Sequence, residues 1–204
     1  DTLVLTHAHP DHLAGLVAVA RNFRIGELWE GRPGPDEGLY AAFSRALGPK
    51  VVRRRVGRGS RFREGLVEIE VLHPALDPAA APNPASNEDS LVIRMALGRV
   101  TFLLMADVGA PTERALLRSG AGLASTVLKA GHHGSAASTS PELLAAVRPR
   151  LVLVSVGDGN TYGFHGCFHE VRPDRIVQTF TFDGQPDGVA LETLWFEDLG
   201  GGRT

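Results

Sequence analysis

Thr6-His7-Ala8-His9-Pro10-Asp11-His12 brings three imidazoles and one carboxylate together in one short segment. Imidazole and carboxylate groups are ligands that suit Zn²⁺ and comparable divalent ions. In an extended segment, alternate residues point the same way. We therefore expect His7 and His9 to bind one ion, while Asp11 and His12, at the start of a helix, reach a neighbouring ion.

The residues around this segment predict a β-α-β-α beginning. The run 2–6 is short, apolar and β-branched, which is typical of a buried strand. From Asp11 onward, apolar residues recur near helical spacing, and an acidic residue favours a helix N-terminus. A second strand is expected at 25–29, followed by a helix at 36–47 that a glycine and a proline end.

The middle of the chain predicts a meander, and the rest returns to alternating helices and strands. The meander strands are expected at 51–56, 66–72, 90–97 and 100–104, with a long loop at 74–87. Further helices are expected at 111–117 and 141–147, and further strands at 126–128, 151–156, 176–182 and 189–196. This pattern predicts an α/β sandwich, with mixed sheets flanked by helices, as one domain over 1–204.

Composition and charge favour a globular domain. The chain has 204 residues, of which 43% are hydrophobic and 22% charged, enough to bury a layered core. Cys167 is the only cysteine, so no internal disulfide is possible. The net charge of −2 gives no overall positive field for nucleic acid. The arginine-rich segment 53–63 is either a solvated face, which we favour, or a phosphate-binding track. No apolar run approaches the ~20 residues that span a bilayer, and the start, without Met or signal peptide, suggests a piece of a longer chain.

Other candidate ligands stand at the ends of other predicted strands. Asp107 follows the run 100–105, where a carboxylate can bridge two metal ions with its two oxygens. His132 and His133 follow the strand at 126–128, and open α/β sheets place their sites at such strand ends. One of these two histidines should complete the metal shell, and the other should contact substrate or donate a supporting hydrogen bond. His73 is either a ligand or a packed loop histidine.

Two further histidines lie near the C-terminus. His165 and His169 follow the strand expected at 151–156, in a segment that also holds Cys167. Each is either a surface histidine or, if the fold brings it near the other imidazoles, a contact for the metal or the leaving group. The candidate catalytic residues are Asp11, His133 and His165.

Together these segments resemble the metallo-β-lactamase superfamily, and within it the hydrolase domain of the ComEC family of DNA-uptake channel proteins. The similar segments are 3–16, 71–74, 87–92, 102–107, 128–135 and 160–163. The resemblance implies an αββα sandwich with two divalent ions, Zn or Mn, in a hydrolytic site. The candidate metal ligands are then His7, His9, Asp11, His12, Asp107, His132 and His133.

Three features depart from that family. The strands that usually precede the metal-binding segment are absent, which implies a sandwich that lacks its N-terminal strands. His9 stands where ComEC domains often carry aspartate, and this fuller ligand set favours a metallated site. Phe164 follows Tyr162 and Gly163, whereas the family continues there with His-Pro and a helix.

The leading hypothesis is metal-dependent hydrolysis of phosphodiesters in DNA, with single-stranded DNA as the partner during competence-related uptake. One alternative keeps the metals but takes a small phosphodiester, thioester or lactone, which the lack of net positive charge favours. Another is a non-catalytic domain of a DNA-transport machine. A membrane channel in the parent chain, with this domain on the extracytoplasmic face, is implied by the resemblance alone.

Overall fold

The computed structural model describes residues 1–34, 37–76, 86–155, 164–171, 175–182 and 189–195. The chain forms two compact units, Asp1–Ser155 and Val156–Thr204. The expectation of one domain over 1–204 stays a prediction. All the histidines and acids of the segment 7–12, together with Asp107, His132 and His133, belong to the first unit.

A parallel three-stranded sheet opens the first unit. Its strands, in spatial order, are β1 (Thr2–Leu5), β2 (Glu27–Glu30) and β3 (Val52–Arg55). The connections run through α1 (Pro10–Asn22) and α2 (Gly38–Leu47). Leu5, Glu30 and Arg55 are aligned by the pairing, so the carboxyl ends of the three strands meet at one edge of this sheet.

A mixed sheet of six strands forms the other half of the first unit, with its strands in sequence order. They are β4 (Arg61–Glu64), β5 (Val67–His73), β6 (Val92–Leu97), β7 (Val100–Leu104), β8 (Val127–Lys129) and β9 (Leu151–Leu153). The pairs from β4 to β7 are antiparallel, and the pairs from β7 to β9 are parallel. The connections contain α3 (Ala110–Arg118), α4 (Pro141–Val147) and two 3-10 turns, η1 (Asn87–Asp89) and η2 (His132–Gly134).

Three apolar clusters join these elements into four layers. One packs Leu5 and Leu28 of the first sheet against Leu13 and Phe43 of its helices. A second lies between the sheets, where Trp29 of β2 stacks on Phe62 of β4 with ring centroids 3.9 Å apart. The third packs strands of the second sheet against α3 and α4, through the buried residues Leu103, Leu116, Leu128 and Leu143.

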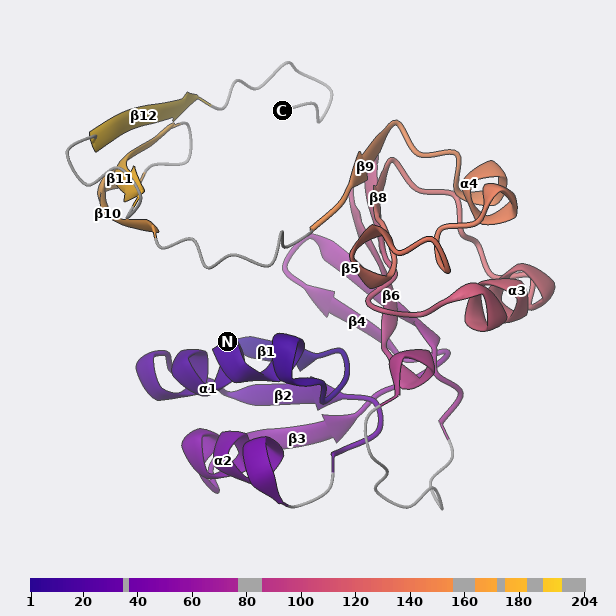
Figure 1. The fold of residues 1–204 in the computed structure, drawn as a ribbon, viewed down its shortest axis with the longest axis horizontal. Coiled ribbons are helices and arrows are strands. Elements are labelled where there is room, and N and C mark those ends of the chain that lie inside the picture. The colour runs from indigo at the N-terminus through magenta and orange to yellow at the C-terminus, as the bar shows by residue number, and fades with distance from the viewer. Residues whose placement is uncertain (35–36, 77–85, 156–163, 172–174, 183–188, 196–204) are drawn as a thin grey trace. The chain divides into compact units, whose positions relative to one another are not determined.

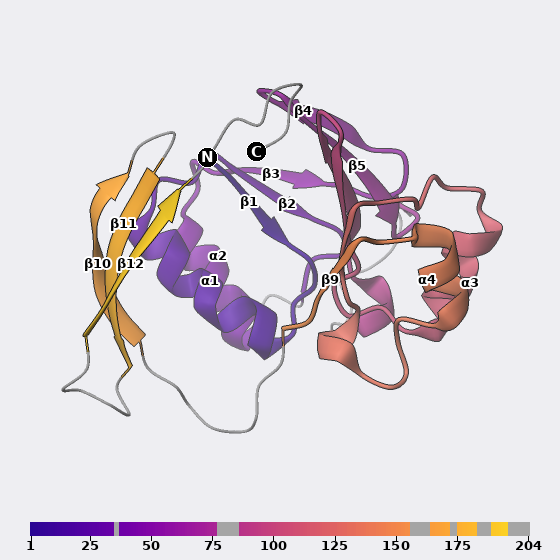
Figure 2. The same cartoon turned by 90° about the horizontal axis from the view of Figure 1, so that it is seen from above.

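The order of layers is therefore helix, sheet, sheet, helix. Figures 1 and 2 show α1 and α2 outside the first sheet, and α3 and α4 outside the second. This confirms the predicted αββα sandwich. None of the described helices is long and apolar enough to cross a membrane.

Two strands of the first unit differ from the sequence-based expectation. The run expected as the first meander strand, β3, instead pairs in parallel with β2 in the first sheet. Strand β4, which begins the meander, was not predicted. Its residues Arg61–Glu64 are charged except for Phe62, so the segment lacks the apolar content that signals a strand.

The second unit contains an antiparallel sheet of three strands. These are β10 (Phe164–Val171), β11 (Arg175–Phe182) and β12 (Val189–Trp195), in that order. Strands β11 and β12 confirm the two predicted terminal strands, whereas β10 was not expected. Glu170 and Arg175 form an ion pair beside the connection between β10 and β11.

Candidate metal centre

The histidine-rich segment occupies the turn from β1 into α1. His7 follows directly after the strand and is 4% exposed. Helix α1 begins at Pro10, with Asp11 in its first turn, and the amide of Leu13 donates to the carbonyl of His9 at 2.9 Å. Extended backbone through His9 is therefore followed at once by a helix that contains Asp11 and His12, as the sequence predicts.

Asp107 lies just beyond the end of β7 and is close to three of the candidate histidines. It is 2% exposed, and its Oδ2 is 3.0 Å from His12 Nε2 and 3.8 Å from His7 Nε2. The same oxygen lies 3.4 Å from His133 Nε2. One carboxylate oxygen thus faces three imidazole nitrogens that come from two distant parts of the chain.

His133 reaches the cluster from the turn η2, which follows β8. Its Nε2 is 3.3 Å from His12 Nε2 and 3.4 Å from Asp11 Oδ2. Its Nδ1 lies 2.9 Å from the carbonyl oxygen of Ser155, which can only accept a hydrogen bond. The proton of neutral His133 is therefore on Nδ1, and the lone pair of Nε2 faces the cluster, as a metal ligand requires.

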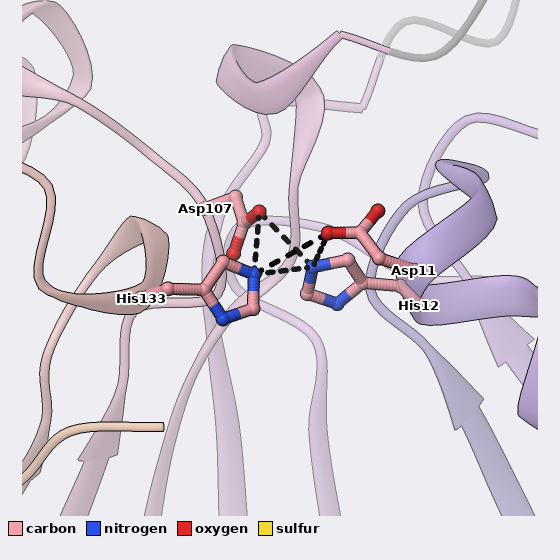
Figure 3. Close-up of side chains that lie close together, drawn as sticks. All are labelled: Asp11, His12, Asp107 and His133. Carbon is pink, nitrogen blue, oxygen red and sulfur yellow. Dashed lines mark hydrogen bonds and ion pairs between the residues drawn. The ribbon is translucent and has the colours of Figure 1, made fainter. Parts of the chain in front are cut away.

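The ligand atoms of Asp11, His12, Asp107 and His133 all lie within 4.8 Å of one another. Figure 3 shows the two imidazoles and the two carboxylates pointing toward a common centre. The ring of His7 lies 4.3 Å from that of His12 and 4.7 Å from that of His9, measured between centroids, so the first histidines join the same group.

Two buried atoms of this cluster have no hydrogen-bond partner among the described residues, His7 Nε2 and Asp107 Oδ1. A buried polar atom without a partner is costly, and coordination of a cation would remove that cost. A cation would also accommodate the facing Nε2 atoms of His12 and His133, 3.3 Å apart, since each can offer it a lone pair. The donor set of imidazoles and carboxylates therefore fits a divalent cation of the zinc type.

Burial controls the charge state of the innermost histidine. Desolvation, and then the neighbouring imidazole of His12, lower the pKa of His7 to about 4, although Asp107 acts in the opposite direction. His7 is therefore neutral near pH 7 and keeps a lone pair available. For Asp11, slight burial opposes ionisation, but its own backbone amide and the imidazoles of His12 and His133 lower the carboxyl pKa below its usual value.

Strained backbone surrounds the cluster. Ala106, His132 and His133 have φ values of 47°, 43° and 54°, in the left-handed region that residues other than glycine rarely adopt. Such conformations cost of order 1–3 kcal/mol each and occur preferentially at functional sites. The strained residues are therefore in or next to the residues whose ligand atoms converge.

The two adjacent histidines take different places. His133 enters the cluster, whereas His132 Nε2 lies 3.3 Å from the side-chain amide nitrogen of Asn87, and His132 is outside the group of four converging residues. His73 is also outside this group of four, and its Nε2 lies 2.7 Å from the carbonyl oxygen of Glu88. The side chains of His73 and His132 thus contact residues of the turn η1.

Sequence reasoning did not single out Glu88, although it holds the loop after Asp107. Its carboxylate accepts hydrogen bonds from the amides of Gly109 and Thr112, at 3.0 and 3.2 Å, at the N-terminus of α3. A Cβ at Gly109 would lie 2.9 Å from Glu88 Oε1, so a side chain at this position would displace the carboxylate. No local pattern marks such a carboxylate, because its partners are more than twenty positions away.

The candidate catalytic residue His165 belongs to β10 in the second unit. Its side chain, like that of His169, lies outside the described residues. The roles considered for these two histidines therefore stay predictions.

Comparison with known proteins identifies a family for most of the chain. Residues 1–158 match the model of the metallo-beta-lactamase superfamily. The chain is 29% identical over 168 residues to ComE operon protein 3 of Bacillus subtilis and 31% identical over 163 residues to competence protein ComA of Neisseria gonorrhoeae. Each alignment covers 79% of this chain, and the chain spans about a fifth of the relatives, 20% and 21% of their lengths.

The fold has neighbours among solved structures. CmlA, a diiron beta-hydroxylase from Streptomyces venezuelae, matches with a TM-score of 0.50 and 19% identity, over 74% of this chain and 34% of that protein. At this identity the likeness concerns the fold alone. The chain belongs to the metallo-beta-lactamase superfamily, with competence proteins among its relatives.

Proposed function

We propose that the chain is a metal-dependent hydrolase that cleaves phosphodiesters in DNA, with single-stranded DNA as its main substrate. The observation that carries the proposal is the convergence of Asp11, His12, Asp107 and His133, whose ligand atoms lie within 4.8 Å of one another. The name of one relative, competence protein ComA of Neisseria gonorrhoeae, supports DNA as the substrate.

In this proposal His7 and His9 would hold one divalent ion, Asp11, His12 and His133 would hold a second, and Asp107 would be a ligand to both. When bound, such ions lower the pKa of water towards ~7 and neutralise charge on phosphoryl oxygens. The buried carboxylate of Asp107 would supply negative charge to offset the bound cations. The side chain of Asp11 is 59% exposed, so it lies on the solvent side of the cluster.

Asp11 is the residue to which we assign proton transfer. Its lowered pKa keeps the carboxyl ionised at neutral pH, so it can orient the attacking water and accept its proton. The side chain of His133 is 36% exposed beside Asp11, so it can contact the phosphodiester. His7 and Asp107 are too deeply buried to exchange protons with solvent directly.

A direct test incubates the metal-loaded protein with labelled single-stranded DNA and Mn²⁺ or Zn²⁺. Cleavage that a chelator abolishes, and that Asp107→Asn abolishes, supports the proposal, because this variant keeps the shape and removes the charge. Glu142→Gln is the control, since Glu142 is an exposed acid in the first turn of α4 and lies outside the cluster. If folded, metal-loaded protein leaves DNA intact, the nuclease proposal is wrong.

A second candidate substrate is a small phosphodiester, thioester or lactone. The net charge of −2 favours it, because nothing in the overall charge attracts a polyanion. A panel of chromogenic esters separates the two, since a nuclease should ignore most of them. Metal analysis of the purified protein, including iron, tests the non-catalytic alternative: folded protein that takes up no metal would favour it over both hydrolases.

A further inference from the structure

A fully buried carboxylate connects two segments that carry ligands of the candidate metal centre. Glu113 lies in the first turn of α3 and is 0% exposed. Helix α3 follows Asp107, whereas the residues 131–140, called the His133 loop below, follow β8. Glu113 is not among the four residues whose ligand atoms converge. A carboxylate is costly to bury unless hydrogen bonds compensate it, so its partners show what it holds in place.

Both oxygens of this carboxylate bind the end of the His133 loop. Oε1 of Glu113 accepts from the amide of Thr139, and Oε2 accepts from the amide of Ser140 at 2.9 Å. Ser140 is also the N-cap of α4, where its hydroxyl oxygen accepts from the amide of Leu143 at 3.3 Å. The carboxylate therefore fixes the end of the loop to α3 at the point where α4 begins.

The end of the His133 loop in turn holds its beginning, next to the two histidines. The hydroxyl oxygen of Thr139 accepts from the amide of Gly131 at 3.1 Å, and the hydroxyl of Ser138 donates to the carbonyl of Gly131 at 2.8 Å. A Cβ at Gly131 would lie 2.9 Å from the carbonyl oxygen of Val108, so close packing restrains the same residue. The residue before His132 is therefore held on both of its backbone polar groups.

This support bears on the strained backbone of His132 and His133. Their φ values of 43° and 54°, and that of Thr139 at 58°, lie in the left-handed region. Conformations of this kind persist only where the surrounding contacts hold them. Relaxation of the two histidines would turn the imidazole of His133 away from Asp107, whose Oδ2 lies 3.4 Å from Nε2. The metal centre thus depends on what keeps the loop in this conformation.

We propose that Glu113 is a positioning residue of the metal centre and acts through Thr139 and Gly131. By this route it keeps Nε2 of His133 turned toward the cluster and Nδ1 beside the carbonyl oxygen of Ser155. The inference rests on the metal centre of the proposed function and is independent of the substrate. The alternative is a role confined to stability, in which metal affinity does not respond to Glu113 more than to any other buried residue of the two helices.

Zinc affinity, measured by competition with an indicator, is the first test. Glu113→Gln keeps the shape but replaces one acceptor oxygen with an amide nitrogen, so it should weaken zinc binding about 10- to 100-fold. Val147→Ala is the matched control, because Val147 is 1% exposed at the far end of α4. It should lower the unfolding midpoint and leave zinc affinity unchanged. Thr139→Val removes only the acceptor for Gly131 and should weaken zinc binding about two- to tenfold.

A double-mutant cycle shows whether Glu113 acts through His133. If it does, Glu113→Gln should cause no further loss of zinc affinity in a chain that already carries His133→Ala. The tautomer of His133 gives a second readout, which needs no metal. In proton–nitrogen correlation spectra of the metal-free chain at pH 8, the ring proton should be on Nδ1 in the unchanged chain and in Val147→Ala. In Glu113→Gln it should be distributed over both ring nitrogens.

The outcomes separate this inference from the proposed function. The inference is wrong if folded Glu113→Gln binds zinc as tightly as the unchanged chain, if Val147→Ala loses as much affinity, or if the losses add in the cycle. An unchanged tautomer also contradicts it. If Glu113→Gln does not fold, Thr139→Val takes its place in the cycle and in the spectra. If the unchanged chain binds no zinc but the tautomer responds as expected, the proposed hydrolase fails and the positioning of His133 by Glu113 stands.

Discussion

The carboxylate of Glu88 accepts hydrogen bonds from both the amide and the hydroxyl of Thr112, at 3.2 and 2.5 Å. Its other oxygen accepts from the amide of Gly109, two residues after Asp107. Three donors on one carboxylate fix the loop that carries the central ligand of the candidate metal centre. Residues that orient metal ligands in this way contribute substantially to metal affinity.

Glu88→Gln should weaken zinc binding by about 10- to 100-fold, because the amide nitrogen cannot accept from the backbone and Asp107 loses its anchor. Titration against a zinc indicator measures this. Glu30→Gln is the matched control, since Glu30 is 4% exposed and pairs with Tyr40, outside the cluster. It should lower the unfolding midpoint and leave zinc affinity unchanged. Equal affinity losses in both variants would show that Glu88 acts only through stability.

Metal binding should raise the melting temperature of the chain, and Asp107→Asn should remove that rise. At a free metal concentration 100 times the Kd, binding stabilises a folded protein by about 2.7 kcal/mol. For a chain of this size that corresponds to roughly 5–10 °C. Differential scanning fluorimetry with and without Zn²⁺ measures both proteins. A rise of the same size in Asp107→Asn would place the metal elsewhere.

The metal-free protein should lose stability as the pH falls from 6.5 to 4. The pKa of His7 is about 4 in the folded chain and 6.5 in the unfolded chain, so the unfolded state binds more protons between these values. The contribution of His7 is therefore complete above pH 6.5 and disappears as the pH falls toward 4. Urea unfolding midpoints at pH 4.5, 5.5 and 7 measure the dependence, which should be shallower in His7→Gln. Parallel curves for the two proteins would contradict this origin.

Core packing under α3 and α4 should dominate the stability of the first unit. Leu103 is fully buried in the cluster that joins the second sheet to these helices. Leu103→Ala should therefore cost about 2–5 kcal/mol in the free energy of unfolding. Leu66, which is 75% exposed, gives the control: Leu66→Ala should change it by less than about 0.5 kcal/mol. Chemical denaturation of the metal-free chain compares the two, and similar losses would count against the layered core.

Local patterns were enough to predict much of the first unit. The β1 strand and the histidines after it are contiguous, so the alternation of an extended segment and the start of α1 could be derived from neighbours alone. The strand β3 was predicted at nearly the right residues but assigned to the wrong sheet. Strand partners are chosen by tertiary packing, and the run 51–56 carries no information about them.

Tertiary contacts also explain why the sequence did not assign separate roles to His132 and His133, or any role to Glu88. His132 and His133 are chemically equivalent in the sequence, and their separation depends on two consecutive left-handed residues and on the carbonyl of Ser155. The anchoring role of Glu88 depends on partners 21 and 24 positions away. Periodicity and motif spacing describe neither kind of contact.

Anomalous scattering from crystals of the chain grown with Zn²⁺ or Mn²⁺ tests the metal centre most directly. Peaks should lie between His12, Asp107 and His133. His7 Nε2 and Asp107 Oδ1, the buried atoms of this cluster without a hydrogen-bond partner in the described part of the chain, should be turned toward them. Folded protein whose only peaks lie outside this cluster, or that shows no peak at saturating metal, would contradict the account.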